Sequence, residues 1–330
     1  MTRHALHRAT RLVLTTLIAF LLAPLFGAQA APLQPLKVAY LGAIDTVVLH
    51  HAVEAGFFKQ QGLDVQTLRI NDGPAVISAV LSGSAQIGYA AATPPAIAYE
   101  HGQPLSIFAT ANYERYPYSA NMTTIIASKR SGITTIAGLK GKTIASNAQP
   151  SGCTITIEQH LAQAGLSIHD VKLLIIPFPN MQAAMALGET DAVCTIVPFL
   201  TAMQLNPGIK PTVLARGTIA DLKKIGKVAV TSYFGSSSWV KSHHAVIKRF
   251  LVAMQKSQAD LNAHPAVYHR DLIKYFHMKP AFAAKVPLAI SKASLVAKPS
   301  DYQSLFDALH KAGMLPKRLK ADKVVTTITP

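Results

Sequence analysis

A short segment near the middle of the chain, residues 147–154 (Asn-Ala-Gln-Pro-Ser-Gly-Cys-Thr), combines hydroxyl groups with the predicted start of a helix. The first amide groups of a helix have no intrahelical acceptor and lie at the positive end of the helix dipole. Together with Ser151, Gly152, Cys153 and Thr154, they predict a site for a sulfonate, carboxylate or nitrate group that needs no full positive charge. The alternative is that Ser151 or Thr154 serves only as the N-cap of the helix.

Other side chains are candidates for ligand contact, and each has a structural alternative. Asp45 could recognise a cationic or amine-bearing ligand, or cap the helix that follows it. The hydroxyl of Thr93 could likewise contact a ligand, or serve only as a helix N-cap. Arg115, the only arginine of residues 113–120, could hold an anion through two hydrogen bonds, or lie exposed on the surface. The ring of Phe199 could face a ligand or pack in the core.

The two cysteines of the chain, Cys153 and Cys194, are 41 residues apart and follow or end neighbouring predicted strands. A disulfide between them and a pair of buried thiols both remain open. A catalytic cysteine is disfavoured, because His160 would lie two helical turns beyond Cys153. The adjacent histidines His50–His51 and His243–His244 would point in different directions on a helix, so no metal site is expected.

Strand-like and helix-like segments alternate along most of the chain, which predicts an α/β fold with two successive lobes. Apolar runs typical of strands occupy residues 36–40, 63–70, 85–90, 105–111, 123–128, 143–146, 171–177, 192–197 and 228–239. Helical periodicity occupies residues 47–57, 75–82, 96–100, 154–164 and 181–187, and most of the chain after 243.

Loops at the carboxyl ends of the strands are the expected ligand site, because α/β sheets bind ligands there. Four loops take this position: Gly42-Ala43-Ile44-Asp45, Ala91-Ala92-Thr93-Pro94, residues 147–154, and Val197-Pro198-Phe199. They add Gly42, Ala43, Ala92 and Pro198 to the candidate ligand-binding residues.

The first thirty residues read as a secretory signal peptide, with three arginines, an apolar run over 12–25 and the small residues Ala28 and Ala30 at a cleavage site. We therefore expect a periplasmic protein. The formal charge is +16, and +13 without those three arginines. Nucleic-acid binding is not expected, because the basic residues are scattered and do not alternate with aromatic ones.

Four segments in a fixed order carry a family resemblance. They are residues 54–59 (EAGFFK) running into 62–65 (GLDV), 81–88 (LSGSAQIG), 139–145 (LKGKTIA), and 187–192 (LGETDA) leading to Pro198. Together they resemble the nitrate/sulfonate/taurine and thiamine-pyrimidine type of substrate-binding protein of ABC importers.

The resemblance implies a two-lobed periplasmic-binding-protein clamp of type II, with a hinge and the second lobe inserted into the first. The expected domains are a signal peptide (1–30), the first part of lobe 1 (31–120), lobe 2 (121–242) and C-terminal helices that return to lobe 1 (243–330). The implied function is capture of a small, anionic organic molecule, such as a sulfonate, taurine or nitrate, in the cleft between the lobes.

The expected partners are this ligand and an ABC permease in the inner membrane, and the protein is expected to be a monomer with no cofactor. Two alternatives stay open. One is an enzyme similar to the thiamine-pyrimidine synthase, although the chain lacks that enzyme's clustered cysteines. The other is a ligand sensor that docks on a membrane receptor.

Overall fold

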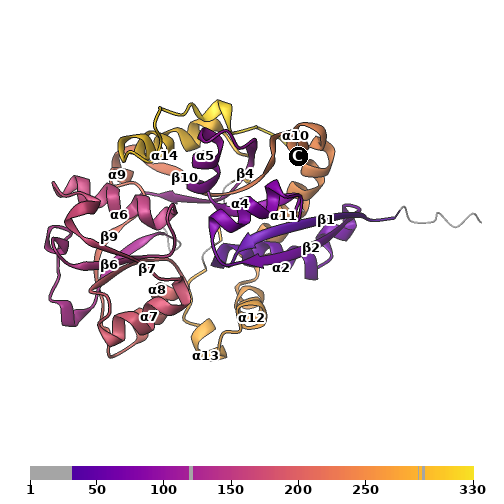
Figure 1. The fold of residues 1–330 in the computed structure, drawn as a ribbon. Coiled ribbons are helices and arrows are strands. Elements are labelled where there is room, and N and C mark those ends of the chain that lie inside the picture. Colours follow the sequence, from indigo (N-terminus) through magenta and orange to yellow (C-terminus); the bar gives the residue numbers. More distant parts are fainter. Residues whose placement is uncertain (1–31, 119–121, 289, 292–293) are drawn as a thin grey trace, which may run out of the picture. The chain divides into compact units, whose positions relative to one another are not determined.

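Two five-stranded sheets organise the chain (Figure 1). The structure is a computed structural model that describes residues 32–118, 122–288, 290–291 and 294–330. The predicted signal peptide lies outside the described residues. Both sheets mix parallel and antiparallel strands and carry helices. The predicted α/β class is therefore confirmed.

The first sheet has the strand order β2-β1-β3-β10-β4. Strands β1, β2 and β3 are parallel, and β10 is antiparallel to both β3 and β4. The strands are β1 (Gln34–Leu41), β2 (Leu63–Ile70), β3 (Ile87–Ala91), β4 (Leu105–Arg115) and β10 (Lys227–Ser236).

The second sheet has the order β7-β6-β8-β5-β9. Strand β6 is parallel to its neighbours β7 and β8, and β5 is antiparallel to its neighbours β8 and β9. Its strands are β5 (Thr124–Ala127), β6 (Thr143–Ser146), β7 (Lys172–Ile175), β8 (Ala192–Thr195) and β9 (Thr212–Arg216). The helices between them, which share its core, are α6 (Gly152–Gln163), α7 (Phe178–Leu187) and α8 (Phe199–Leu205).

Each face of the first sheet is covered by a separate hydrophobic core, because alternate residues of a strand point to opposite faces. Val38 belongs to the core shared with helices α2 and α11, and its neighbour Ala39 to the core shared with α4 and α14. The helices of this part are α2 (Val47–Glu54), α3 (Phe57–Gln60), α4 (Gly73–Leu81), α5 (Thr93–Glu100), α9 (Leu222–Ile225), α10 (Ser237–Ser242), α11 (His244–Ala263), α12 (Pro265–Phe276), α13 (Pro280–Ala283) and α14 (Pro299–Lys311).

Strand β10 lies in the first sheet, although the sequence analysis placed residues 227–242 in the second lobe. The chain leaves the first sheet after β4, forms the second sheet between Thr124 and Arg216, and returns through β10. The apolar run of β10 would fit either sheet, so only its pairing with β3 and β4 assigns it. Helices α11, α12 and α14, which follow residue 243, pack in the two cores that cover the first sheet.

Local chemistry explains several element ends. Gly188 ends α7 with a φ of 81°, a left-handed conformation that glycine adopts without strain. Asp72 and Ser151 cap α4 and α6 by accepting hydrogen bonds from the backbone amides of Ala75 and Thr154.

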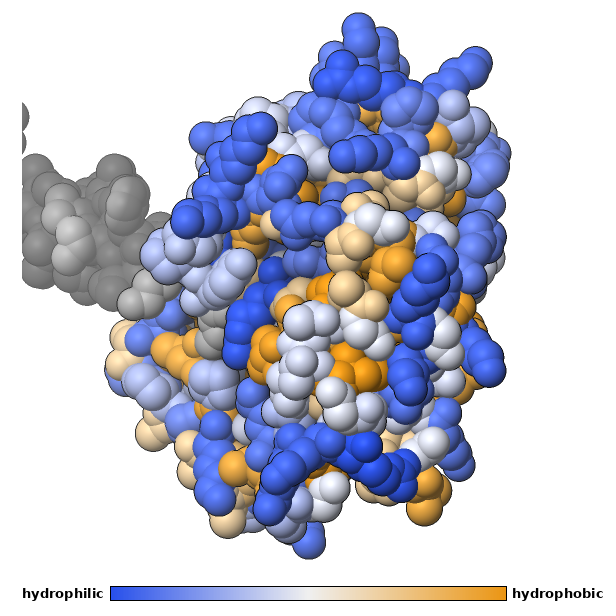
Figure 2. Space-filling model, turned by 90° about the vertical axis from the view of Figure 1, so that its left-hand side faces the viewer, coloured by the Kyte–Doolittle hydropathy of each residue, from blue (hydrophilic) through white to orange (hydrophobic). Residues whose placement is uncertain are grey.

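Within the described residues, we find no helix both long and apolar enough to span a membrane. The face seen in Figure 2 is mostly hydrophilic, with hydrophobic residues in smaller groups.

Candidate functional site

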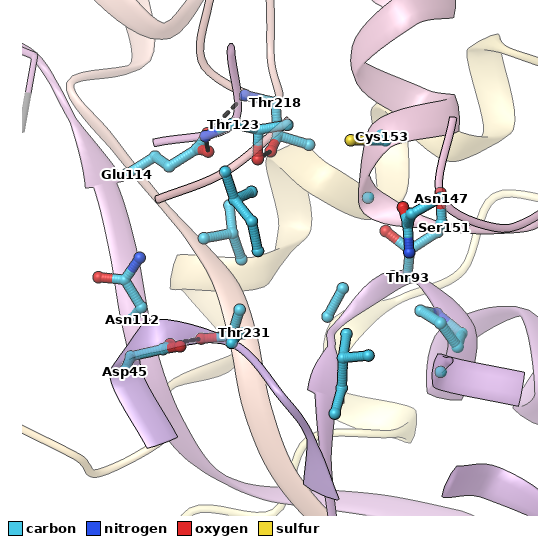
Figure 3. Close-up of a pocket in the computed structure, with 18 of the residues that line it drawn as sticks. Asp45, Thr93, Asn112, Glu114, Thr123, Asn147, Ser151, Cys153, Thr218 and Thr231 are labelled. Atoms are coloured by element: carbon cyan, nitrogen blue, oxygen red, sulfur yellow. Dashed lines mark hydrogen bonds between the residues drawn. The ribbon is translucent and has the colours of Figure 1, made fainter. Parts of the chain in front are cut away.

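A pocket lies between the two sheets, and both contribute to its walls (Figure 3). The space open to the centre of a water-sized sphere is about 70 Å³. The first sheet, with its loops and helices, contributes Leu41, Ala43, Asp45, Gly73, Tyr89, Ala91, Thr93, Pro94, Asn112, Glu114, Val230, Thr231 and Leu305. The second sheet and the connecting segments contribute Thr123, Asn147, Ser151, Gly152, Cys153, Phe178, Ile196 and Thr218.

Half of the candidate ligand-binding residues line this pocket, and half do not. Those that line it come from three of the four expected loops: Ala43, Asp45, Thr93, Ser151, Gly152 and Cys153. The other six are Gly42, Ala92, Arg115, Thr154, Pro198 and Phe199. Their assignment to ligand binding stays a prediction.

The physical reason differs among the residues outside the lining. Gly42 faces the side chain of Arg69, and Ala92 and Pro198 are buried in their own lobes. Arg115 is exposed at the end of β4. The ring of Phe199 stacks on Phe178, at 5.5 Å between ring centroids. Of these two rings, Phe178 lines the pocket.

The start of α6 forms one wall of the pocket. Ser151 is the N-cap, and its Oγ accepts a 3.1 Å hydrogen bond from the amide of Thr154. The amides of Gly152 and Cys153 belong to the first turn, where no intrahelical acceptor exists. This wall therefore supplies hydrogen-bond donors and the positive end of a helix dipole, as the sequence predicted for this loop.

The hydroxyl of Thr154 serves its own loop. It donates a 2.9 Å hydrogen bond to the carbonyl of Ala148 and lies within hydrogen-bond distance of Ser146 and Ser151. Thr154 is fully buried and does not line the pocket. The structure therefore assigns this hydroxyl to the geometry of the α6 N-terminus.

We expect Thr154→Val to lower the free energy of unfolding by about 0.5–1.5 kcal/mol, the usual value of a lost internal hydrogen bond. Ligand affinity should change little, because the side chain does not reach the pocket. Chemical denaturation and calorimetric titration measure the two effects, and Thr154→Ser, which keeps the hydroxyl, is the control. A variant with wild-type stability and weakened binding would contradict this assignment.

The opposite wall carries a buried acid that the sequence had singled out. Asp45 lies in the 3-10 helix Ile44–Thr46, and its Oδ2 accepts a 3.0 Å hydrogen bond from the hydroxyl of Thr231 on β10. Burial raises the pKa of the Asp45 carboxyl, and the nearby hydroxyls of Tyr89 and Thr231 offset part of this rise. Asp45 is a pocket residue, and its side chain does not cap the helix that follows.

Glu114 is a second buried acid of the pocket, and the sequence analysis did not identify it. Its two carboxylate oxygens each accept one hydrogen bond, from the backbone amides of Thr123 and Thr218 respectively. Burial raises the pKa of Glu114, and these hydrogen bonds oppose the rise. Thr123 and Thr218 belong to the two segments that join the sheets, so one side chain on β4 holds both connections. The available signal was an acid one residue before the end of a strand whose other residues, apart from Arg115, carry no charge.

The two cysteines are close together as free, buried thiols. Burial is the main cause of the raised pKa of the Cys194 thiol, and the neighbouring Cys153 adds to it. The disulfide that the sequence left open is not formed in the structure. Both cysteines belong to the core of the second sheet, and Cys153 also lines the pocket.

The histidine pair His50–His51 has structural contacts. His50 stacks on Tyr275, and His51 lies between the carboxylates of Asp260 and Asp271 at 2.7 and 2.8 Å. No group of three or more histidine, cysteine, aspartate or glutamate side chains in the described part of the chain is arranged to hold a metal ion.

Comparison with known proteins places this chain in a family. The family model described as NMT1/THI5 like matches residues 44–267, which is more than half of the chain. This chain belongs to the NMT1/THI5-like family. The match spans strands of both sheets and most of the loops around the pocket.

Individual relatives are more distant. The chain is 25% identical over 236 residues to the putative aliphatic sulfonates-binding protein of Escherichia coli, which covers 71% of this chain and 68% of that one. The alkanesulfonate-binding protein SsuA of Xanthomonas axonopodis pv. citri, solved with bound MOPS, has a TM-score of 0.75 at 23% identity, over 90% of this chain and 99% of that chain.

The nitrate-binding protein NrtA of Synechocystis PCC 6803 has a TM-score of 0.70 at 16% identity, over 89% of this chain and 86% of that chain. At these identities the solved structures establish the fold. The predicted two-lobed periplasmic-binding-protein architecture is confirmed.

Proposed function

We propose that this protein is the solute-binding component of an ABC import system, that it acts in the periplasm as a monomer, and that it captures a small organic molecule in the pocket between its lobes. The observation that carries the proposal is the composition of the pocket wall. Residues of both sheets face one cavity, so a ligand there contacts both lobes at once. A ligand that bridges two lobes stabilises their closed arrangement, which is the form that a permease would recognise.

The family and its relatives support this role. The Escherichia coli relative is named as a binding protein for aliphatic sulfonates, and the structural neighbours include sulfonate-binding and nitrate-binding proteins. A structure of the same general fold belongs to a desulfurization enzyme, at a TM-score of 0.62 and 12% identity. The fold alone therefore does not separate binding from catalysis, and the binding role rests on the family and the pocket together.

A thermal-stability screen tests the binding role directly. We expect at least one compound among sulfonates, carboxylates, nitrate, pyrimidines and amines to stabilise the purified protein, by about 2.7 kcal/mol at one hundred times its dissociation constant. Uptake of that compound by cells with and without the gene then separates import from sensing, because only an import component is required for uptake.

A matched pair of variants at Gly152 locates the binding site. An added Cβ at Gly152 would lie 3.5 Å from the Cβ of Ala91 in the first sheet, an ordinary contact, so Gly152→Ala should still bind ligand. Gly152→Leu places a larger side chain between the lobes and should abolish the stabilisation. Equal binding by both variants would place the ligand elsewhere and contradict the proposal.

A further inference from the structure

We infer that the pocket recognises a positively charged nitrogen of its ligand, a protonated amine or an amidinium group, held against the carboxylate of Asp45. This inference rests on the proposed function, because it assigns a ligand class to the same pocket. It departs from the anionic ligand that the sequence analysis expected.

The charged residues of the pocket carry the first step. Asp45 and Glu114 line it, and no lysine, arginine or histidine is among the described residues that do. Arg115, the arginine expected to bind an anion, is exposed and outside the lining. An anionic group would thus enter a buried site beside two acids, with only helix amides and hydroxyls to offset the repulsion. A cation is attracted by the same two acids.

The hydrogen bonds of the two acids separate their roles. Both oxygens of Glu114 are occupied by backbone amides of the connecting segments. Asp45 accepts one side-chain hydrogen bond of normal geometry, at Oδ2 from Thr231, and the hydroxyl of Tyr89 lies near the same carboxyl. Of the two acids, Asp45 is therefore the one with an oxygen to spare for a ligand.

Tyr89 provides a second, independent observation. Its side chain lines the pocket and is fully buried, and its hydroxyl lies near Asp45 and Thr231 without a hydrogen bond of normal geometry to any described residue. Burial raises the pKa of this hydroxyl, and the charge of Asp45 and its close approach to the hydroxyl raise it further. Buried polar groups are normally paired, so an unpaired one in a pocket indicates a missing partner. An ammonium or amidinium group has several N–H donors and could serve the Asp45 carboxylate and the Tyr89 oxygen together.

The opposite wall and the pocket size limit the rest of the ligand. Figure 3 shows Asn147, Ser151 and Cys153 across the pocket from Asp45, Asn112 and Thr231. These groups can hydrogen-bond a polar end of the ligand at the start of α6. A space of about 70 Å³ corresponds to about five to seven water molecules, at roughly 10–15 Å³ for each. The ligand that fits this arrangement is therefore small.

Isosteric pairs of opposite charge test the inference. Amidinium and carboxylate groups have nearly the same shape, so acetamidinium with acetate, and benzamidinium with benzoate, differ mainly in charge. Butylammonium with butanesulfonate adds an aliphatic pair. Binding of each compound to the purified protein is measured by calorimetric titration or, for weak binders, by NMR. We expect the cation to bind more tightly in the pairs that bind, with at least one cation binding measurably.

Tighter binding of the anions, or no binding by any of the cations, would overturn the inference. Tighter binding of the anions would leave the proposed function intact, because a ligand would still occupy the pocket. The proposed function itself fails if neither these compounds nor any compound of the wider screen binds.

Substitution of the acid identifies its role. Asp45→Asn keeps the size of the side chain and an acceptor for Thr231, and should weaken binding of the cationic probe by about ten- to hundredfold. Asp322→Asn removes the same charge from an exposed position outside the pocket lining and should leave binding unchanged. Equal losses in both variants, or none at Asp45, would contradict the inference. A melting curve of Asp45→Asn verifies that the variant is folded.

Discussion

Glu114→Ala is expected to lower the free energy of unfolding by about 2–6 kcal/mol, because two buried amides would each lose their acceptor at about 1–3 kcal/mol. These amides belong to Thr123 and Thr218, one in each connection between the sheets. Denaturant unfolding monitored by circular dichroism measures the effect.

Two controls bracket this result. Glu114→Gln retains one carbonyl oxygen as an acceptor. Its free energy of unfolding should therefore fall between those of the wild type and the alanine variant. Glu189→Ala removes an exposed glutamate from the second lobe and should change stability by no more than about 0.5 kcal/mol. If Glu114→Ala is no more harmful than Glu189→Ala, the carboxylate does not hold the connections.

His51→Ala is expected to cost about 3–5 kcal/mol near pH 6, the usual effect of removing one partner from a buried ion pair. His51 on α2 bridges Asp260 on α11 and Asp271 on α12, and Asp271 is fully buried. Arg270 continues to pair with Asp271 in the variant, which favours the lower end of this range. His264→Ala, which removes an exposed histidine from Asp260, is the matched control and should cost little.

The same histidine predicts a pH dependence of known sign. Burial favours the neutral ring of His51, but the hydrogen bonds and charges of Asp271 and Asp260 outweigh it, so the net effect is a raised pKa. The folded state then binds this proton more tightly than the unfolded state. The stabilisation is complete below the unfolded pKa of about 6.5 and is lost as the pH rises through the folded value.

Unfolding free energies measured from pH 5 to 9 should therefore show a fall in the wild type that is reduced in His51→Ala. A parallel fall in both proteins would assign the pH dependence to other groups.

The alternation of strands and helices could be predicted from sequence because its signals are local. Glycine ends helices through its own backbone freedom, and Ser151 caps α6 through a contact three residues away. The loops that reach the pocket followed from the same reasoning, since the carboxyl ends of strands are known once the strands are. Asp45, Thr93 and Ser151 were found in this way.

The rest of the site depends on pairing between distant segments. Thr231 and Tyr89 come together only because β10 returns to pair with β3, which the periodicity of β10 could not reveal. Glu114 and Arg115 point to opposite sides of β4, since neighbours in a strand alternate. The sequence analysis selected the arginine, and the structure brings the glutamate to the pocket.

The position of Glu114 has a mechanical consequence for ligand capture. Because the Glu114 side chain holds both connections, we expect it to lie at the hinge. Any rotation of one lobe against the other would then displace atoms more the farther they lie from Glu114. Groups on the first sheet, such as Asp45 and Tyr89, would be in place before the lobes approach. The start of α6 belongs to the second lobe. A ligand would thus contact the first-lobe wall, with Asp45 and Tyr89, before it contacts the second lobe. The hydrogen-bond donors at the start of α6 would reach the ligand only when the lobes close.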